Sequence, residues 1–151
     1  GKQIRAFVRN GGNVISVNSA NLINGEVTSG TVFAEIQKNQ PMPTLVFSDA
    51  VFDDMEERAQ RMTFYQEASA MESFLAELGM LAKQNAYQRI VIAGGETSGA
   101  VAISLGYQAF YLGRIVAPGV PELIPVDDPS ITLVMKSGNF GGEDFFEEAL
   151  R

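Results

Sequence analysis

The sequence predicts a single α/β domain of the Rossmann-like kind, with three layers: a mostly parallel sheet and helices on both of its faces. Segments rich in β-branched residues alternate with segments whose apolar residues have helical spacing, and this alternation runs through the whole chain. The length of 151 residues is that of one ordinary domain. Apolar residues make up 46% of the chain, which is the usual share in a globular protein.

The first third of the chain predicts two helices and two strands. Apolar residues at helical spacing predict helices over residues 3–9 and 29–38, and a Gly-Gly pair ends the first of them. Strands are expected over residues 13–17 and 44–48. The first strand leads into a turn at Asn18-Ser19, and the second follows a Pro-Met-Pro break.

The middle of the chain predicts a long helix, a strand and a second helix. The spacing of apolar residues predicts the long helix over residues 67–85. A continuous apolar run predicts a strand over residues 89–93, of the kind that is buried on both faces of a parallel sheet. A helix is expected over residues 98–105, ending at Gly106.

The last third predicts two more strands and a closing helix. The strands are expected over residues 109–112 and 131–135. The helix is expected over residues 143–150, with acidic residues in its first turn that complement the helix dipole. Between the strands, Ala117-Pro118-Gly119-Val120-Pro121 predicts a rigid turn.

The chain begins directly with a helix. In a βαβ arrangement a strand precedes such a helix, so we expect the domain to lack its first strand here.

Composition excludes several classes of function. With 11 basic and 18 acidic residues the net charge is −7, which disfavours a nucleic-acid partner. Cysteine and histidine are absent, which excludes disulfides, zinc fingers, thiolate catalysis and histidine–metal sites. No apolar run approaches the roughly 20 residues that span a bilayer, and no segment reads as a signal peptide. We therefore expect a cytoplasmic domain without a membrane partner, which must hold any phosphate ligand with a few local groups.

Two glycine-containing loops are candidates for such a site. The first is Gly94-Gly95-Glu96-Thr97-Ser98-Gly99, and the second is Lys136-Ser137-Gly138-Asn139-Phe140-Gly141-Gly142. Each follows a predicted buried strand and precedes a predicted helix. Ligands of open α/β sheets bind at the carboxyl ends of the strands, where helix N-termini offer unpaired amides to an anion.

Neither loop matches the P-loop or the Rossmann G-x-G-x-x-G pattern. A structural alternative therefore stays open: Gly94-Gly95 makes a tight turn, and Thr97 or Ser98 caps the helix. The second loop points more strongly to an anion, because Lys136 closes a predicted buried strand. Acidic residues at positions 122, 127 and 128 are candidate magnesium ligands, or simply a solvated loop.

The order and spacing of three motifs resemble the four-carbon acid sugar kinases. The motifs are Gly94-Gly95-Glu96-Thr97-Ser98-Gly99, Pro118-Gly119-Val120-Pro121, and Lys136 to Gly141 with Asp144-Phe145 beyond. The resemblance covers residues 89–150 and extends more weakly back to Gln3-Ile4.

The resemblance implies a division of labour between two domains. Chains of that family are about two and a half times longer, with an N-terminal domain for the acid sugar and a C-terminal domain for ATP. Residues 1–151 resemble the C-terminal domain alone. Members phosphorylate the 4-hydroxyl of threonate, erythronate or 3-oxo-tetronate, so the resemblance implies an ATP-dependent kinase whose isolated fragment is inactive. The alternative is a non-catalytic module that binds a nucleotide or a sugar phosphate.

The resemblance also implies site residues and partners. Those carried over to the nucleotide site are Gly94, Gly95, Glu96, Thr97, Lys136, Ser137, Gly138 and Gly141. ATP, with Mg²⁺ bridging its phosphates, is the implied cofactor. The general base and the clamp for the sugar carboxylate are assigned to the absent domain, together with the acid sugar itself. A homodimer is compatible with this arrangement.

Overall fold

The computed structural model describes residues 1–49, 59–137 and 140–151, and only the backbone of residues 59–62 and 95–97. The helices are α1 (Lys2–Arg9), α2 (Ser19–Ile23), α3 (Ser29–Lys38), α4 (Ala59–Gln84), α5 (Gly95–Leu105) and α6 (Phe145–Leu150). The strands are β1 (Asn13–Val17), β2 (Thr44–Ser48), β3 (Arg89–Ala93), β4 (Phe110–Ala117), β5 (Val120–Pro125) and β6 (Thr132–Lys136). Among the described residues, no helix combines the length and the apolar character needed to cross a membrane.

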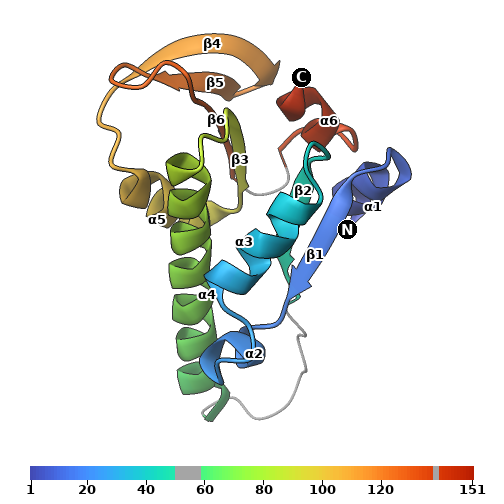
Figure 1. Cartoon of the computed structure of the whole chain (residues 1–151), viewed down its shortest axis with the longest axis vertical. Helices are drawn as coiled ribbons and strands as arrows, with labels where there is room; N and C mark the ends of the chain where they lie inside the picture. Colours follow the sequence, from blue (N-terminus) through green and yellow to red (C-terminus); the bar gives the residue numbers. More distant parts are fainter. Residues whose placement is uncertain (50–58, 138–139) are drawn as a thin grey trace.

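The strands form two sheets that stand side by side (Figure 1). One contains β1 and β2, which pair in parallel, and the other has the order β3-β6-β5-β4. In the larger sheet β3 and β6 are parallel, whereas β5 is antiparallel to both β6 and β4. The predicted α/β class is confirmed, and the sheet is mixed rather than mostly parallel because β4 and β5 form a hairpin.

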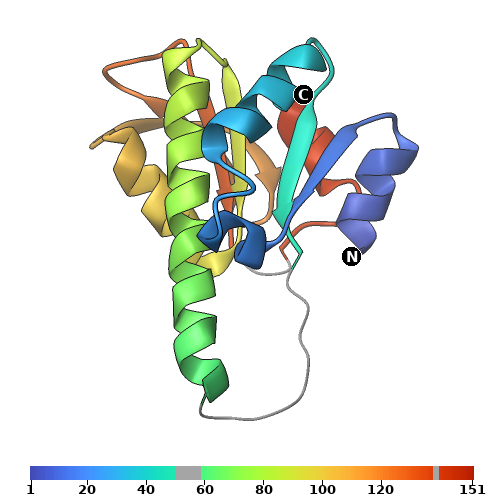
Figure 2. The same cartoon turned by 60° about the horizontal axis from the view of Figure 1, so that its bottom comes forward.

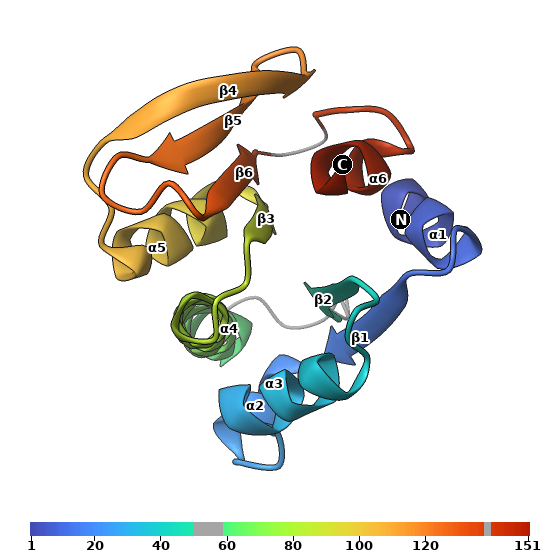
Figure 3. The ribbon, with the colours of Figure 1, turned by 45° about the horizontal axis from the view of Figure 1, so that its top comes forward.

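Helices cover both faces of the strands, so the predicted three layers are confirmed. Figure 3 shows α1 and α6 side by side on one face, and α2, α3, α4 and α5 on the other. Figure 2 shows α4 running past both sheets, which agrees with its contacts to α2, α3 and α5. This helix is longer than the predicted 67–85, since it begins at Ala59.

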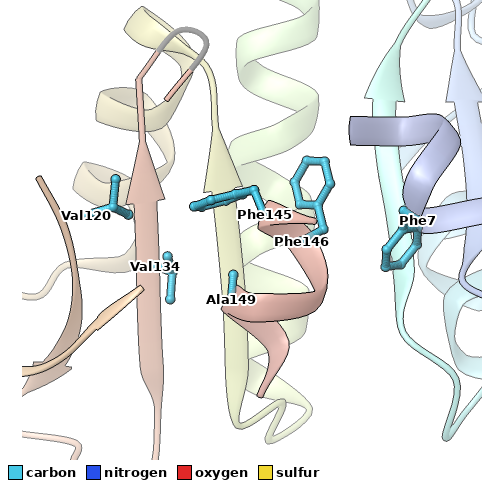
Figure 4. Packing of buried hydrophobic residues seen from close by; sticks show 6 residues of the cluster. All are labelled: Phe7, Val120, Val134, Phe145, Phe146 and Ala149. Atoms are coloured by element: carbon cyan, nitrogen blue, oxygen red, sulfur yellow. The ribbon is translucent and has the colours of Figure 1, made fainter. Parts of the chain in front are cut away.

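The core consists of three clusters. The cluster between the strands and α1 and α6 contains Phe7, Val120, Val134, Phe145, Phe146 and Ala149, shown in Figure 4. On the other face, one cluster lies between the small sheet and α3 and α4, and the third lies between the large sheet and α5. On α1, Ala6 and Phe7 are buried, whereas Val8 is 48% exposed.

Strands β2 and β3 are the neighbouring edges of the two sheets, with no described strand between them (Figures 1 and 3). The prediction that β3 is buried on both faces is therefore wrong. Only Ile92 of this strand is buried, while Ile90 and Val91 are half-buried. Leu45 of β2 and Val91 of β3 nevertheless pack against the same core cluster.

The predicted turn at Asn18-Ser19 is instead the start of the short helix α2. The Asn18 side chain accepts a hydrogen bond from the Ala20 N–H at 2.9 Å, which is a typical N-cap. Asparagine favours both turns and helix starts, and only five helical residues follow, so periodicity could not separate the two.

The rigid turn predicted over residues 117–121 is shorter than expected. Pro118-Gly119 connects β4 to β5, and Gly119 has a φ of +77°. The strand predicted over 109–112 extends to Ala117, and β5 was missed. The prolines at 121 and 125 explain the miss, because proline normally argues against a strand inside a sheet.

Candidate phosphate-binding site

The two glycine loops begin side by side. Strands β3 and β6 are parallel neighbours, and Ala93 lies opposite Lys136 in their register. The Gly94 N–H donates to the Lys136 carbonyl over 3.0 Å, which extends the pairing one step into the loops. The carboxyl ends of the two strands therefore bring the two candidate loops to one edge of the sheet, where ligands of α/β folds bind.

Gly94 adopts a backbone conformation that depends on glycine. Its φ of 121° and ψ of 152° lie in a region that residues with a Cβ rarely enter. Helix α5 begins at Gly95, three residues before the predicted start, and Gly94 occupies its N-cap position without a side-chain bond. The alternative that Thr97 or Ser98 caps this helix is therefore wrong.

Gly95, Glu96 and Thr97 form the first turn of α5 rather than a preceding loop. A first helical turn has backbone amides without intrahelical partners, and these amides carry the positive end of the helix dipole. The structure does not describe the side chains of Glu96 and Thr97, so only the backbone relates these three residues to the site.

Lys136 is the buried cation of the site. It is 5% exposed, at the carboxyl end of β6, and its Nζ lies 5.2 Å from the centre of the Phe145 ring. Burial lowers the pKa of Lys136 because the charged amine loses hydration there. An anion bound beside the Lys136 amine would raise its pKa again and so favour the charged form.

The loop after β6 carries a second position that requires glycine. Gly141 has a φ of +84°, and a Cβ at this position would lie 2.5 Å from Cδ2 of Phe145. Ser137 is exposed beside Lys136, whereas Gly138 lies outside the described residues. The described part of this loop therefore packs closely on the aromatic ring that also contacts Lys136.

Gln3, to which the sequence assigns no role, contacts the second candidate loop. Its amide nitrogen lies within 3.0–3.4 Å of the carbonyl oxygens of Phe140, Gly141 and Gly142. The weak likeness at Gln3-Ile4 was the only signal in the sequence, because these residues are more than 130 positions apart.

The candidate magnesium ligands are not assembled into a metal site. Glu122 is buried against Arg89 and Arg114, and its hydrogen bond from Arg89 is the main cause of its lowered pKa. Asp128 accepts hydrogen bonds from Ser130 and Tyr107, while Asp127 is exposed. Within the described ranges no three acidic side chains are grouped as metal ligands. Glu122 and Asp128 therefore have structural partners, whereas Asp127 faces solvent.

The assembled residues are of the kinds that bind anions in proteins. Two glycine-dependent backbone positions, a helix N-terminus and a buried lysine lie at one edge of the sheet. Magnesium bound with a nucleotide normally keeps several waters and takes phosphate oxygens as ligands, so it does not require a dedicated protein cage.

Comparison with known proteins gives one family and several longer relatives. A family model described as a nucleotide-binding C-terminal domain matches residues 1–146. A 3-oxo-tetronate kinase from Cupriavidus necator is 34% identical in an alignment of 151 positions, which covers 99% of this chain and 34% of that kinase. A 3-oxo-tetronate kinase from Haemophilus influenzae is 46% identical over 84 residues, 56% of this chain and 20% of the kinase.

The fold also matches a solved structure. A crystal structure of a Haemophilus influenzae protein of the DUF1537 family superposes with a TM-score of 0.83 and 31% sequence identity. The match covers 99% of this chain and 36% of that protein. The chain thus spans about a third of the length of the relatives that match it along its whole length.

Proposed function

Because the chain belongs to the family of nucleotide-binding C-terminal domains, we propose that it binds ATP at the edge of the sheet where β3 and β6 end. The observation that carries the proposal is the pairing of Gly94 with Lys136, which brings a helix N-terminus and a buried cation together. The proposed contacts are made by residues 94–97, by Lys136 and Ser137, and by Gly138 and Gly141.

We propose that the kinase activity requires a longer protein than this chain. The relatives that carry the name 3-oxo-tetronate kinase are about three times as long as this chain, and the chain matches one part of them. We infer that this domain supplies the nucleotide site of a kinase acting on the 4-hydroxyl of a four-carbon acid sugar. The acid sugar and the general base are assigned to the remaining part of such a protein.

The chemistry of phosphoryl transfer agrees with the residue types at the site. The transferred group carries negative charge over several oxygens, so positioning and electrostatic stabilisation matter more than covalent chemistry. The first amides of α5 would hold phosphate oxygens, and Lys136 would neutralise their charge. Mg²⁺ would arrive with ATP and bridge its phosphates.

Two measurements test the proposal. Mg-ATP at millimolar concentration should raise the melting temperature of this chain, since a ligand that binds only the native state stabilises it. The same chain should give no turnover with threonate, erythronate or 3-oxo-tetronate. An unmoved melting temperature would argue against the nucleotide site, and turnover by this chain alone would refute the division of labour.

We also propose that a further strand lies between β2 and β3 in the longer protein. Both edges are largely apolar, their residues other than Ile92 are not fully buried, and both belong to parallel ladders. A parallel strand there would join the two sheets into one. The amides of β2 and β3 should then exchange hydrogen more slowly in the longer protein than in this chain, and equal rates would count against the added strand.

A further inference from the structure

Three consecutive carbonyl groups converge on the side chain of Gln3. The Gln3 Nε2 atom lies 3.2 Å from the Phe140 oxygen, 3.4 Å from that of Gly141 and 3.0 Å from that of Gly142. Three acceptors around one atom require a donor, so the amide nitrogen of Gln3 faces the loop. Its two hydrogens are shared among the three carbonyls.

Gln3 lies on an element that is fixed to the same part of the molecule. In the view of Figure 3, α1 lies beside α6, and the Phe7 and Phe146 ring centres are 6.0 Å apart. Asn10, the C-cap residue that follows α1, donates a hydrogen bond of 2.8 Å to Glu147 of α6. The donor on α1 therefore does not move independently of the helix that follows the loop.

The direction of the carbonyls sets the direction of the amides. In a trans peptide unit the N–H of the next residue points away from the C=O of the preceding one. Because the carbonyls of residues 140–142 point toward Gln3, the N–H groups of Gly141, Gly142 and Glu143 point away from it. None of these three amides donates to a backbone carbonyl of a described residue. Successive amides with a common direction form an anion-binding concavity.

The same loop and Lys136 both contact the Phe145 ring. Gly141 packs so closely on Phe145 that a Cβ at position 141 would lie 2.5 Å from the ring. The Lys136 amine lies 5.2 Å from the centre of the same ring. A loop that shifts away from Gln3 therefore changes the support of the ring beside Lys136.

We propose that Gln3 is a positioning residue that orients the amides of residues 141–143 toward the outer phosphates of the nucleotide. This inference rests on the proposed nucleotide site. Gln3 itself contacts the loop rather than the ligand, so it acts through the loop.

The test uses two substitutions of Gln3 with matched controls. Gln3→Met keeps the length of the side chain and removes the donor, while Gln3→Glu places a carboxylate against three carbonyl oxygens. Gln37→Met and Gln37→Glu make the same changes on the exposed side of α3, which covers the opposite face. Binding of Mg-ATP, AMP and inorganic pyrophosphate is measured by calorimetry, and backbone order parameters of Gly141 and Gly142 by ¹⁵N relaxation.

The expected result is a change in both the loop and the phosphate affinity. In unliganded Gln3→Met, the order parameters of Gly141 and Gly142 should fall from the rigid range of about 0.85 toward about 0.6. The dissociation constants for ATP and pyrophosphate should rise roughly three- to tenfold, as for one lost hydrogen bond, with a smaller change for AMP. Gln3→Glu should weaken ATP further, and the Gln37 variants should behave like the wild type.

Several outcomes would overturn the inference. Unchanged order parameters in Gln3→Met would show that the donor does not hold the loop. A mobile loop with an unchanged ratio of ATP to AMP affinity would reduce Gln3 to a structural role. Wild type that binds pyrophosphate but not ATP would refute the proposed function alone, and the Gln3 variants would then be judged with pyrophosphate. Binding of neither would refute both.

Discussion

Replacing Lys136 by Met separates a phosphate-binding lysine from one that only closes a strand. Methionine retains an apolar stem beside the Phe145 ring and removes the charge. Because Lys136 is 5% exposed and burial lowers its pKa, the protein already bears a desolvation cost for this cation. We therefore expect the free energy of unfolding to change by less than about 1 kcal/mol.

The effect on ATP should be larger than the effect on stability. A hydrogen bond to a charged group contributes roughly 1.5–3 kcal/mol, which corresponds to about a 10- to 150-fold change in dissociation constant. AMP should be affected less, since it lacks the outer phosphates. Calorimetric titration of the variant with Mg-ATP and AMP measures both, with urea unfolding measured in parallel.

Lys83 provides a matched control. It also lies over an aromatic ring, 4.3 Å from the centre of Tyr107, and it donates to the carbonyl of Leu105 at the far end of α5. Lys83→Met should lower stability by about 1 kcal/mol and leave ATP affinity unchanged. If Lys136→Met binds ATP as tightly as the wild type does, the assignment of Lys136 to the phosphates is wrong.

Two further predictions concern stability. Gly94→Ala should lower the free energy of unfolding by about 1–3 kcal/mol, because the φ of 121° at this position is unfavourable for alanine. Gly99→Ala should instead stabilise the protein by about 0.5–1 kcal/mol, because Gly99 lies inside α5 with open space around it. Urea unfolding measures both variants, and equal effects would contradict this prediction. Glu122→Gln should cost about 2–3 kcal/mol at neutral pH, since it leaves Arg89 and Arg114 without their buried carboxylate. The lowered pKa of Glu122 means that its contribution is complete above about pH 4.5 and is lost as the pH falls through the folded-state value, so the variant should lose less stability than the wild type on acidification. Equal pH profiles for the two proteins would refute that role.

The elements with strong local patterns could be read from the sequence. The strands β1, β2 and β3 and the helix α3 have the predicted bounds, because their apolar periodicity and their flanking glycines and prolines agree. The α/β class followed from the same alternation. The two glycine loops were also found in this way, since a strand, a glycine loop and a helix start are adjacent in the chain.

Features that depend on distant partners could not be read in this way. The sequence predicts a turn over residues 117–121 and no strand at β5, which contains Pro121 and Pro125, yet β5 lies inside the larger sheet between β6 and β4. Strand β5 pairs with β4 and β6 although its two prolines lack the backbone N–H groups that would donate hydrogen bonds. The burial of β3 was likewise overestimated, because burial depends on which strand lies beside it.

The candidate site shows the same difference between local features and features that depend on distant partners. The sequence by itself determined which residue types are available, namely glycines that can adopt a positive φ and a lysine at the end of a strand. Only the tertiary structure decided that Gly94 and Lys136 are hydrogen-bonded neighbours and that Gln3 donates to a loop more than 130 residues away. Local conformational preference acts over a few residues, whereas parallel pairing and side-chain contacts between distant segments form only when the whole core is packed.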